Sequence, residues 1–180
     1  MKKRFSIGLL IAFVLFMLVS CNSFKEVTYE EFTSEANNVS EANYTSASVN
    51  VSSSGDIDRS STTALRFYGE NGTYNFKYSN GKWTIADENL DNTKARTASI
   101  MLRLVGVSIE SELLYNSASK ATKYYTGNNS FKVDFTFNNY YNVSEEFNGN
   151  GLLTRCDAVL NYNESSKLKP LKMTVTISYR

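Results

Sequence analysis

The chain has 180 residues, of which 42% are hydrophobic and 21% are charged, and its formal net charge is +1. This length predicts a single domain. The 11 Phe and 12 Tyr residues exclude a disordered chain, and the presence of only two Cys excludes a disulfide scaffold. The chain has no histidine, which excludes Ser-His-Asp and Cys-His catalysis, histidine metal ligands and a histidine pH switch.

The first 21 residues have the pattern of an export signal. Residues 2–4 are basic, and an uncharged apolar run follows over 5–19. The run is at the short limit of the roughly 17–25 residues that a spanning helix needs, so it predicts a signal peptide. It ends in LVSC at 18–21, which resembles the lipobox of bacterial lipoproteins. The resemblance implies cleavage after residue 20 and attachment of acyl chains such as palmitate to Cys21; an ordinary signal peptide and an uncleaved anchor are the alternatives.

The charge balance and the anchor predict the location. Without residues 1–20 the chain has 16 Lys and Arg against 18 Asp and Glu, which excludes a nucleic-acid partner. We expect a monomer that is lipid-anchored in the bacterial cell envelope, outside the cytoplasm. Asn22, where an Asp would signal retention, favours the outer membrane of a diderm; in a monoderm the anchor lies on the outer face of the membrane. Cys156, the remaining thiol, is expected to be buried.

Residues 22–27 are predicted to form a short tether, and residues 28–180 a single folded domain. The sequence TYEE at 28–31 has the form of a capping box and predicts a helix over 29–40. Alternation of apolar and polar residues then predicts strands over 44–52, 62–69, 74–78 and 83–85. Asn80-Gly81 is a favoured hairpin turn, so 44–86 is predicted to be a four-strand meander.

Helical spacing interrupts the strands over 93–117. Two helices are expected there, with Gly106 at the position after the first helix. Four or five further strands follow, near 122 and over 131–137, 140–147, 154–162 and 171–179. An amphipathic sheet must be covered, and the helices are the available cover. The predicted fold is therefore α+β: a strongly curved antiparallel sheet of about eight or nine strands, an open half-barrel with helices packed in its concave face.

Three segments are similar to the LolA/LppX-like family of incomplete barrels, which carry lipids or lipoproteins across bacterial envelopes. They are the leading helix 29–40, the hairpin YSNGKW at 78–83, and the turn FNGNGLL at 147–153. The resemblance lies in the order of elements over most of residues 28–180. Together with Cys21, it implies an anchored member that holds a lipid at a membrane.

No catalytic centre, metal site or cofactor is expected. Adjacent carboxylates occur at 30–31, 87–88 and 145–146, with a further pair at Glu110 and Glu112, and are predicted to be solvated charges or helix caps. The alternating pair Asp56 and Asp58 lacks the remaining ligands of a calcium loop. The sequence thus predicts a protein that is not an enzyme.

The aromatic residues carry the strongest functional signal. The helix residues Ala98, Met101, Leu102 and Val105 are expected to face Phe76, Phe135 and Val175 of the sheet. A carrier or sensor would bind a lipid or other hydrophobic ligand in this concave apolar space. The candidate ligand-binding residues are Phe67, Tyr74, Phe76, Tyr78, Trp83, Met101, Leu102, Val105, Phe131, Phe135, Phe137, Val175 and Tyr179.

The alternative is a surface module with a fully packed core, which binds glycan or protein through exposed tyrosines. The adjacent pairs Tyr124-Tyr125 and Tyr140-Tyr141 direct one ring to each face of their strands, so one ring of each pair is expected to be exposed.

Overall fold

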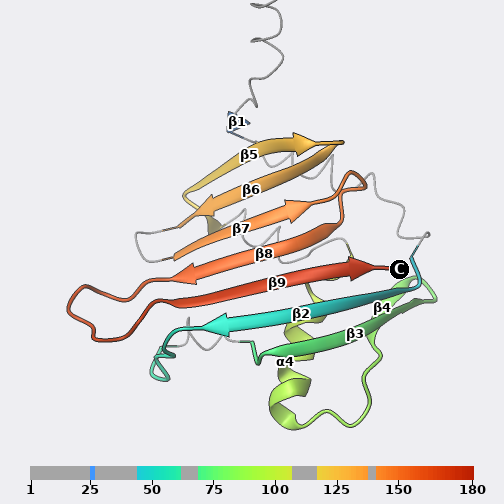
Figure 1. The fold of residues 1–180 in the computed structure, drawn as a ribbon, viewed down its shortest axis with the longest axis horizontal. Helices are drawn as coiled ribbons and strands as arrows, with labels where there is room; N and C mark the ends of the chain where they lie inside the picture. Colours follow the sequence, from blue (N-terminus) through green and yellow to red (C-terminus); the bar gives the residue numbers. More distant parts are fainter. Residues whose placement is uncertain (1–24, 27–43, 62–68, 107–116, 138–140) are drawn as a thin grey trace, which may run out of the picture.

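The structure is a computed structural model that describes residues 25–26, 44–61, 69–106, 117–137 and 141–180. Its nine strands form one open antiparallel sheet in the order β1-β5-β6-β7-β8-β9-β2-β3-β4 (Figure 1). One helix, α4, lies behind the sheet in this view. The α+β class, the antiparallel pairing and the number of strands are as predicted. The bounds are β1 Lys25–Glu26, β2 Ser46–Ser54, β3 Gly72–Ser79, β4 Lys82–Ile85, α4 Asn92–Leu102, β5 Lys120–Gly127, β6 Ser130–Thr136, β7 Tyr141–Phe147, β8 Leu153–Leu160 and β9 Leu171–Tyr179.

Strand β9 lies inside the sheet and joins its two halves. On one side β9 pairs with β8, where Val175 lies opposite Cys156. On the other side β9 pairs with β2, where the same Val175 lies opposite Val51. The backbone of Arg180 extends this pairing, because it bonds to Thr45 and Ser46. The last predicted strand is thus confirmed, and it occupies the middle of the fold.

The two faces of the sheet differ sharply in polarity. Strand side chains alternate between faces, and along β9 every second residue from Leu171 to Ile177 is buried. The same alternation buries Ala47, Val49 and Val51 of β2. We call the face with these buried side chains the inner face. The outer face carries the intervening Ser, Thr, Lys and Asp residues.

Helix α4 packs on the inner face beside β3 and β4. Its N-cap, Asp91, accepts hydrogen bonds from the backbone N–H groups of Thr93 and Lys94. Thr97 links the helix to the segment that leads into β3, because its Oγ1 accepts a hydrogen bond from the backbone N–H of Glu70, 3.1 Å away. Ala98 and Met101 are fully buried, whereas Leu102 is half-buried at the border of the core.

Several details differ from the expectation. Strand β2 pairs directly with β3, so no strand of a meander lies between them. Lys25 and Glu26 pair with β5, although the sequence predicts a free tether there. The helix ends at Leu102 with Arg103 as its C-cap, so Gly106, despite its φ of 83°, is not the residue directly after that cap. The predicted helix 29–40, the strand 62–69 and the second helix of the 93–117 pair lie wholly or largely outside the described residues.

The strongest contacts of α4 lie at one edge of the sheet. The helix contacts β3 and β4, while Phe135 belongs to β6, six places from β4 in the strand order. Phe76 lies on β3, one of the two strands that α4 contacts most. Helical periodicity shows which side of a helix is apolar but not which strands that side covers.

Neighbouring residues of α4 offer a direct test of this packing. Replacing Met101, which is fully buried, by Ala should lower the free energy of unfolding by about 2–5 kcal/mol. Leu102→Ala should cost clearly less, because the side chain is only half-buried. Urea unfolding monitored by circular dichroism measures both. Equal losses for the two variants would contradict this orientation of the helix.

Candidate functional site

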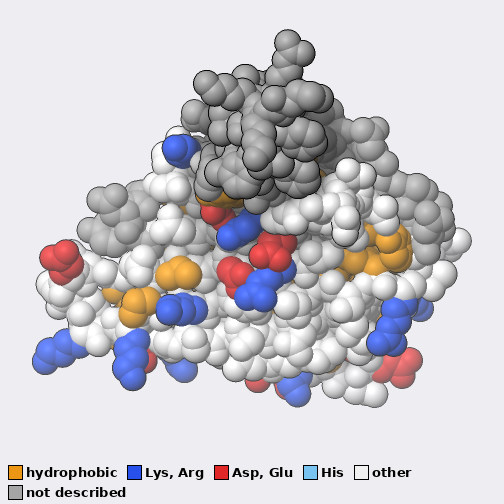
Figure 2. All heavy atoms as spheres, turned by 45° about the horizontal axis from the view of Figure 1, so that its top comes forward, with side chains coloured by type: hydrophobic (Ala, Val, Ile, Leu, Met, Phe, Trp, Pro, Cys, Tyr) orange, Lys and Arg blue, Asp and Glu red, His pale blue; other side chains and the backbone are white. Residues whose placement is uncertain are grey.

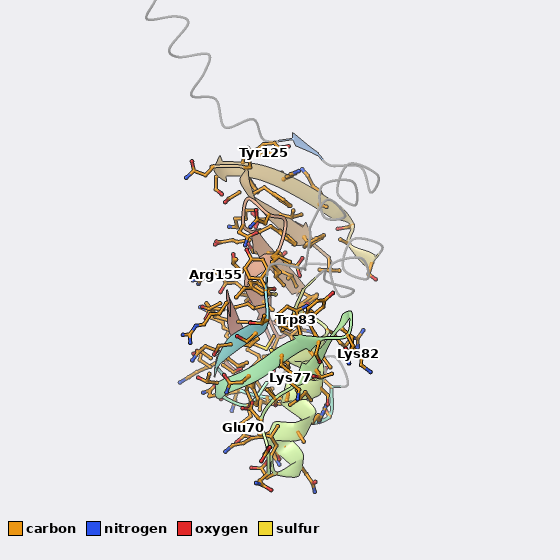
Figure 3. All side chains as sticks on the ribbon, turned by 90° about the vertical axis from the view of Figure 1, so that its right-hand side faces the viewer. Glu70, Lys77, Lys82, Trp83, Tyr125 and Arg155 are labelled. Atoms are coloured by element: carbon orange, nitrogen blue, oxygen red, sulfur yellow. The ribbon has the colours of Figure 1, made fainter. Side chains whose placement is uncertain are left out.

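Four half-buried aromatic side chains meet on the inner face where β3 ends and β4 begins. The ring centroids of Tyr78 and Trp83 are 5.2 Å apart, and those of Trp83 and Tyr179 are 5.9 Å apart. Tyr44, which precedes β2, adds a fourth ring 5.4 Å from Tyr179. We call Tyr44, Tyr78, Trp83 and Tyr179 the aromatic end. Figure 3 shows Trp83 beside the β3–β4 ribbons, above Lys77 and Lys82 in that view.

Local sequence explains why these rings come together. Asn80 and Gly81 have φ angles of 54° and 76°, as a two-residue hairpin turn requires, and the turn places Tyr78 directly opposite Trp83. Tyr179 lies opposite Ala47, whose small side chain leaves space above β2. The rings of Trp83 and Tyr179 meet across that space.

The hydroxyl of Tyr179 ties three elements together. It donates a hydrogen bond to the carbonyl oxygen of Leu153 on β8, at 3.0 Å. It also accepts one from the backbone N–H of Gly106, beyond the end of α4, at 3.1 Å. This tyrosine is therefore a structural link as well as a wall of the aromatic end.

Trp83 presents a polar atom of a different kind. Its indole Nε1 is buried and has no hydrogen-bond partner among the residues that the structure describes. A buried donor normally has a partner, since an unsatisfied one costs roughly 1–3 kcal/mol. The aromatic end therefore combines apolar rings with one hydrogen-bond donor that an acceptor oxygen would satisfy.

The structure divides the predicted ligand-binding residues into core and border. Val175 and Met101 have no exposed surface, and the other core members are at most 5% exposed. Tyr78, Trp83, Leu102, Phe137 and Tyr179 are half-buried. Phe67 lies outside the described residues. The core members are Tyr74, Phe76, Met101, Val105, Phe131, Phe135 and Val175.

Three of the half-buried candidates come together. Tyr78, Trp83 and Tyr179 meet at the aromatic end, whereas Phe137 packs on Tyr141, 4.7 Å between centroids, at the opposite ends of the strands. Sequence reasoning missed Tyr44, because it assigned this residue to the polar side of a strand. The strand begins later, at Ser46, so that alternation does not govern Tyr44.

A second aromatic group lies at the ends of β5, β6 and β7. The rings of Phe131 and Phe147 stack with centroids 4.7 Å apart. The Lys123 ammonium lies over Phe131 at 4.2 Å and over Tyr125 at 4.8 Å, a cation–π arrangement. Lys123 is only 3% exposed, whereas Tyr125 is 42% exposed. The expected exposure of one ring of the pair Tyr124-Tyr125 is confirmed.

The outer face carries charges in a regular arrangement. Figure 2 shows acidic and basic side chains gathered near the middle of one face, and Figure 3 shows Arg155 on the side of the sheet away from α4. Arg155 contacts Asp157 at 2.6 Å, and Lys132 contacts Asp134 at 3.4 Å. All four side chains are roughly one-third to two-fifths exposed, so these pairs contribute little to stability.

Hydrogen bonds also set the protonation of this outer face. Burial alone would raise the pKa of the Asp157 carboxyl, but hydrogen bonds from Arg155 and Thr174 lower it below the usual value. Burial and a hydrogen bond to Asp134 raise the pKa of Tyr124. Both shifts come from pairing within the sheet and mark no reactive group.

The described carboxylates of the suspected pairs are mostly structural. Asp87 accepts hydrogen bonds from the backbone and side-chain nitrogens of Asn75, at 2.7 and 2.8 Å. Asp56 accepts one from the backbone N–H of Lys169, and Asp58 accepts one from that of Ser60. Among the described residues no group of three or more acidic, Cys or His residues could hold a metal.

Glu145 corrects the expectation that residues 145–146 are solvated. Its side chain has no exposed surface, whereas Glu146 is half-buried on the outer face. In the strand register Glu145 lies opposite both Val133 and Cys156, and Val133 in turn lies opposite Lys123. Two buried charged residues therefore share one row of the inner face with a buried thiol, which confirms the expected burial of Cys156.

Comparison with protein-family models, with curated proteins and with solved structures gives no match. No helix in the described part of the chain is long and apolar enough to cross a membrane.

Removing one hydroxyl tests the link made by Tyr179. Tyr179→Phe should lower the free energy of unfolding by about 1–3 kcal/mol, because it leaves the Leu153 carbonyl and the Gly106 N–H without this partner. Tyr44→Phe is the matched control, since the Tyr44 hydroxyl makes an exposed hydrogen bond with Asn150. Chemical unfolding measures both variants. An effect of Tyr179→Phe no larger than that of Tyr44→Phe would refute the link.

Proposed function

We propose that this chain is a lipid-anchored protein of the bacterial envelope that binds a lipid or another hydrophobic ligand and performs no chemistry on it. The ligand binds at the aromatic end of the inner face. In this proposal the sheet is a curved half-barrel of the LolA/LppX-like kind, and helices pack in its concave face. Cys21 carries the acyl chains that hold the domain at the membrane.

One observation supports the aromatic end above the rest of the inner face: its rings are half-buried and continuous with the core. Trp83 and Tyr179 pack against core residues and still reach solvent. An apolar chain can cover such rings without opening the core. The buried Trp83 Nε1 adds a donor for a carboxylate or ester oxygen, so an acyl lipid has both features that the site can satisfy.

The centre of the inner face is a poorer place for a ligand. Phe76, Phe135 and Val175 are at most 1% exposed, so their side chains are already in contact with protein on all sides. A ligand there would have to displace packed side chains. The candidate residues on the core side therefore support the fold, and those at the aromatic end contact the ligand.

The surface-module alternative keeps one observation in its favour. Tyr125 is the more exposed of the two large apolar side chains that stand out from the described surface. A ring with a cation beneath it can contact a sugar or a protein. Competition between a soluble glycan and an acyl lipid for the purified chain distinguishes the two functions.

Trp83 is the single tryptophan of the chain, so its fluorescence reports on the site directly. A brominated fatty acid, whose bromine quenches tryptophan on contact, should quench Trp83 in a saturable manner. Tyr78→Ala should weaken binding about tenfold, because loss of one ring contact worth roughly 1.4 kcal/mol changes affinity by that factor.

Phe137→Ala is the matched control for Tyr78→Ala. Phe137 is also a half-buried aromatic residue, but it lies at the opposite ends of the strands. The affinity of this variant for the brominated fatty acid should equal that of the wild type. Absence of quenching in the wild type, or equal weakening by both variants, would contradict binding at the aromatic end.

The anchor has its own test. Cells grown with an alkyne fatty acid should incorporate the label into the wild-type chain and not into Cys21→Ser, because the thiol is the proposed attachment point. The label is detected on the purified chain after coupling to a dye. Cys156→Ser should retain the label, since its thiol is buried in the sheet. Label that persists in Cys21→Ser would disprove this anchor.

A further inference from the structure

The pairing of β1 with β5 orients the domain relative to residue 21. Lys25 lies opposite Lys123, and Glu26 lies opposite Thr122. Because the pair is antiparallel, lower numbers on β1 correspond to higher numbers on β5. The N-terminal end of β1 therefore lies toward the end of β5 that carries Tyr125.

The distance from Cys21 to this end of the sheet is short. Lys25 is the fourth residue after Cys21, and an extended chain spans at most roughly 3.3–3.6 Å per residue, so the two lie at most about 14 Å apart. Tyr125 is two residues beyond Lys123, about 7 Å along the strand. An acylated Cys21 thus holds the Tyr125 end of β5 within a few nanometres of the bilayer.

The side chains at this end have the character of a membrane-contacting surface. Tyr125 is 42% exposed, and tyrosine is enriched at the level of lipid headgroups. The hairpin that follows, residues 126–129, is exposed and carries no charge.

We propose that the Tyr125 end of the β5–β6 hairpin, around residues 125–130, rests on the lipid headgroups of the membrane. This inference rests on the acylation of Cys21 in the proposed function. The aromatic end lies at the same ends of the strands as Tyr125. The Tyr179 hydroxyl bonds to Leu153 of β8, and Leu153 lies opposite Phe147 of β7. Phe147 in turn lies opposite Phe131 of β6, which lies opposite Tyr125. The ligand site therefore opens toward the bilayer side, and the ligand class is a membrane lipid.

The test places a probe at each exposed apolar position. The full acylated chain with Tyr125→Cys, labelled with an environment-sensitive nitrobenzoxadiazole dye, is reconstituted in phosphatidylcholine–phosphatidylglycerol vesicles. Some vesicles contain phosphatidylcholine with a nitroxide near the headgroup, which quenches dyes close to it. Leu168→Cys is the matched control, because Leu168 is 37% exposed but lies between β8 and β9, at the opposite strand ends. Unsubstituted chain measures the background from Cys156.

The nitroxide lipid should quench the dye at position 125 several-fold more than the dye at position 168. Similar quenching at both positions would overturn this orientation. So would a dye at position 125 whose emission shows an apolar environment without quenching by the nitroxide, because a second copy of the chain would then cover it. Flotation of the chain with the vesicles separates the two proposals. A wild-type chain that does not float overturns the anchor and this orientation together, whereas a chain that floats without selective quenching overturns the orientation alone.

Discussion

The pairing of β9 with β2 is the interaction on which the architecture depends. Without it β2–β4 and β5–β8 would be two separate sheets, each with an exposed apolar edge. The pairing brings together residues far apart in the chain, such as Thr45 and Arg180, which are 135 positions apart. Closing so long a loop carries an entropic cost. Burial of apolar cross-strand pairs such as Val49 and Ile177 offsets this cost. The inner face is continuous because β9 pairs with β2, and the same pairing brings Tyr179 close to Trp83 at the aromatic end.

The sequence predicts elements well and their neighbours poorly. Alternation identified β2, β3, β6 and β9, and Asn80-Gly81 identified a turn with the expected backbone geometry. Alternation describes one strand at a time, so it contains no information on which strands pair. The predicted meander therefore missed that β2 pairs directly with β3. Two paired residues at Lys25 are too few to produce any periodic signal.

The same limit governed the site. Alternation correctly placed Tyr78, Trp83 and Tyr179 on the inner face. It also placed Phe135 and Val175 there, and it could not distinguish these buried residues from the half-buried ones. What separates them is position along the strand and across the sheet, since rings at strand ends reach solvent and those at the centre do not. Glu145 was missed for a related reason: its charge suggested solvent, while its place in the alternation put it inside.

The place of β9 has a consequence for the order in which the chain can fold. Of the nine strands, β9 is the last to be synthesised, yet it lies between two others. While it is still being made, β2 and β8 each present an unpaired edge, and the two halves of the sheet cannot join. The complete sheet therefore forms only after translation has passed residue 179.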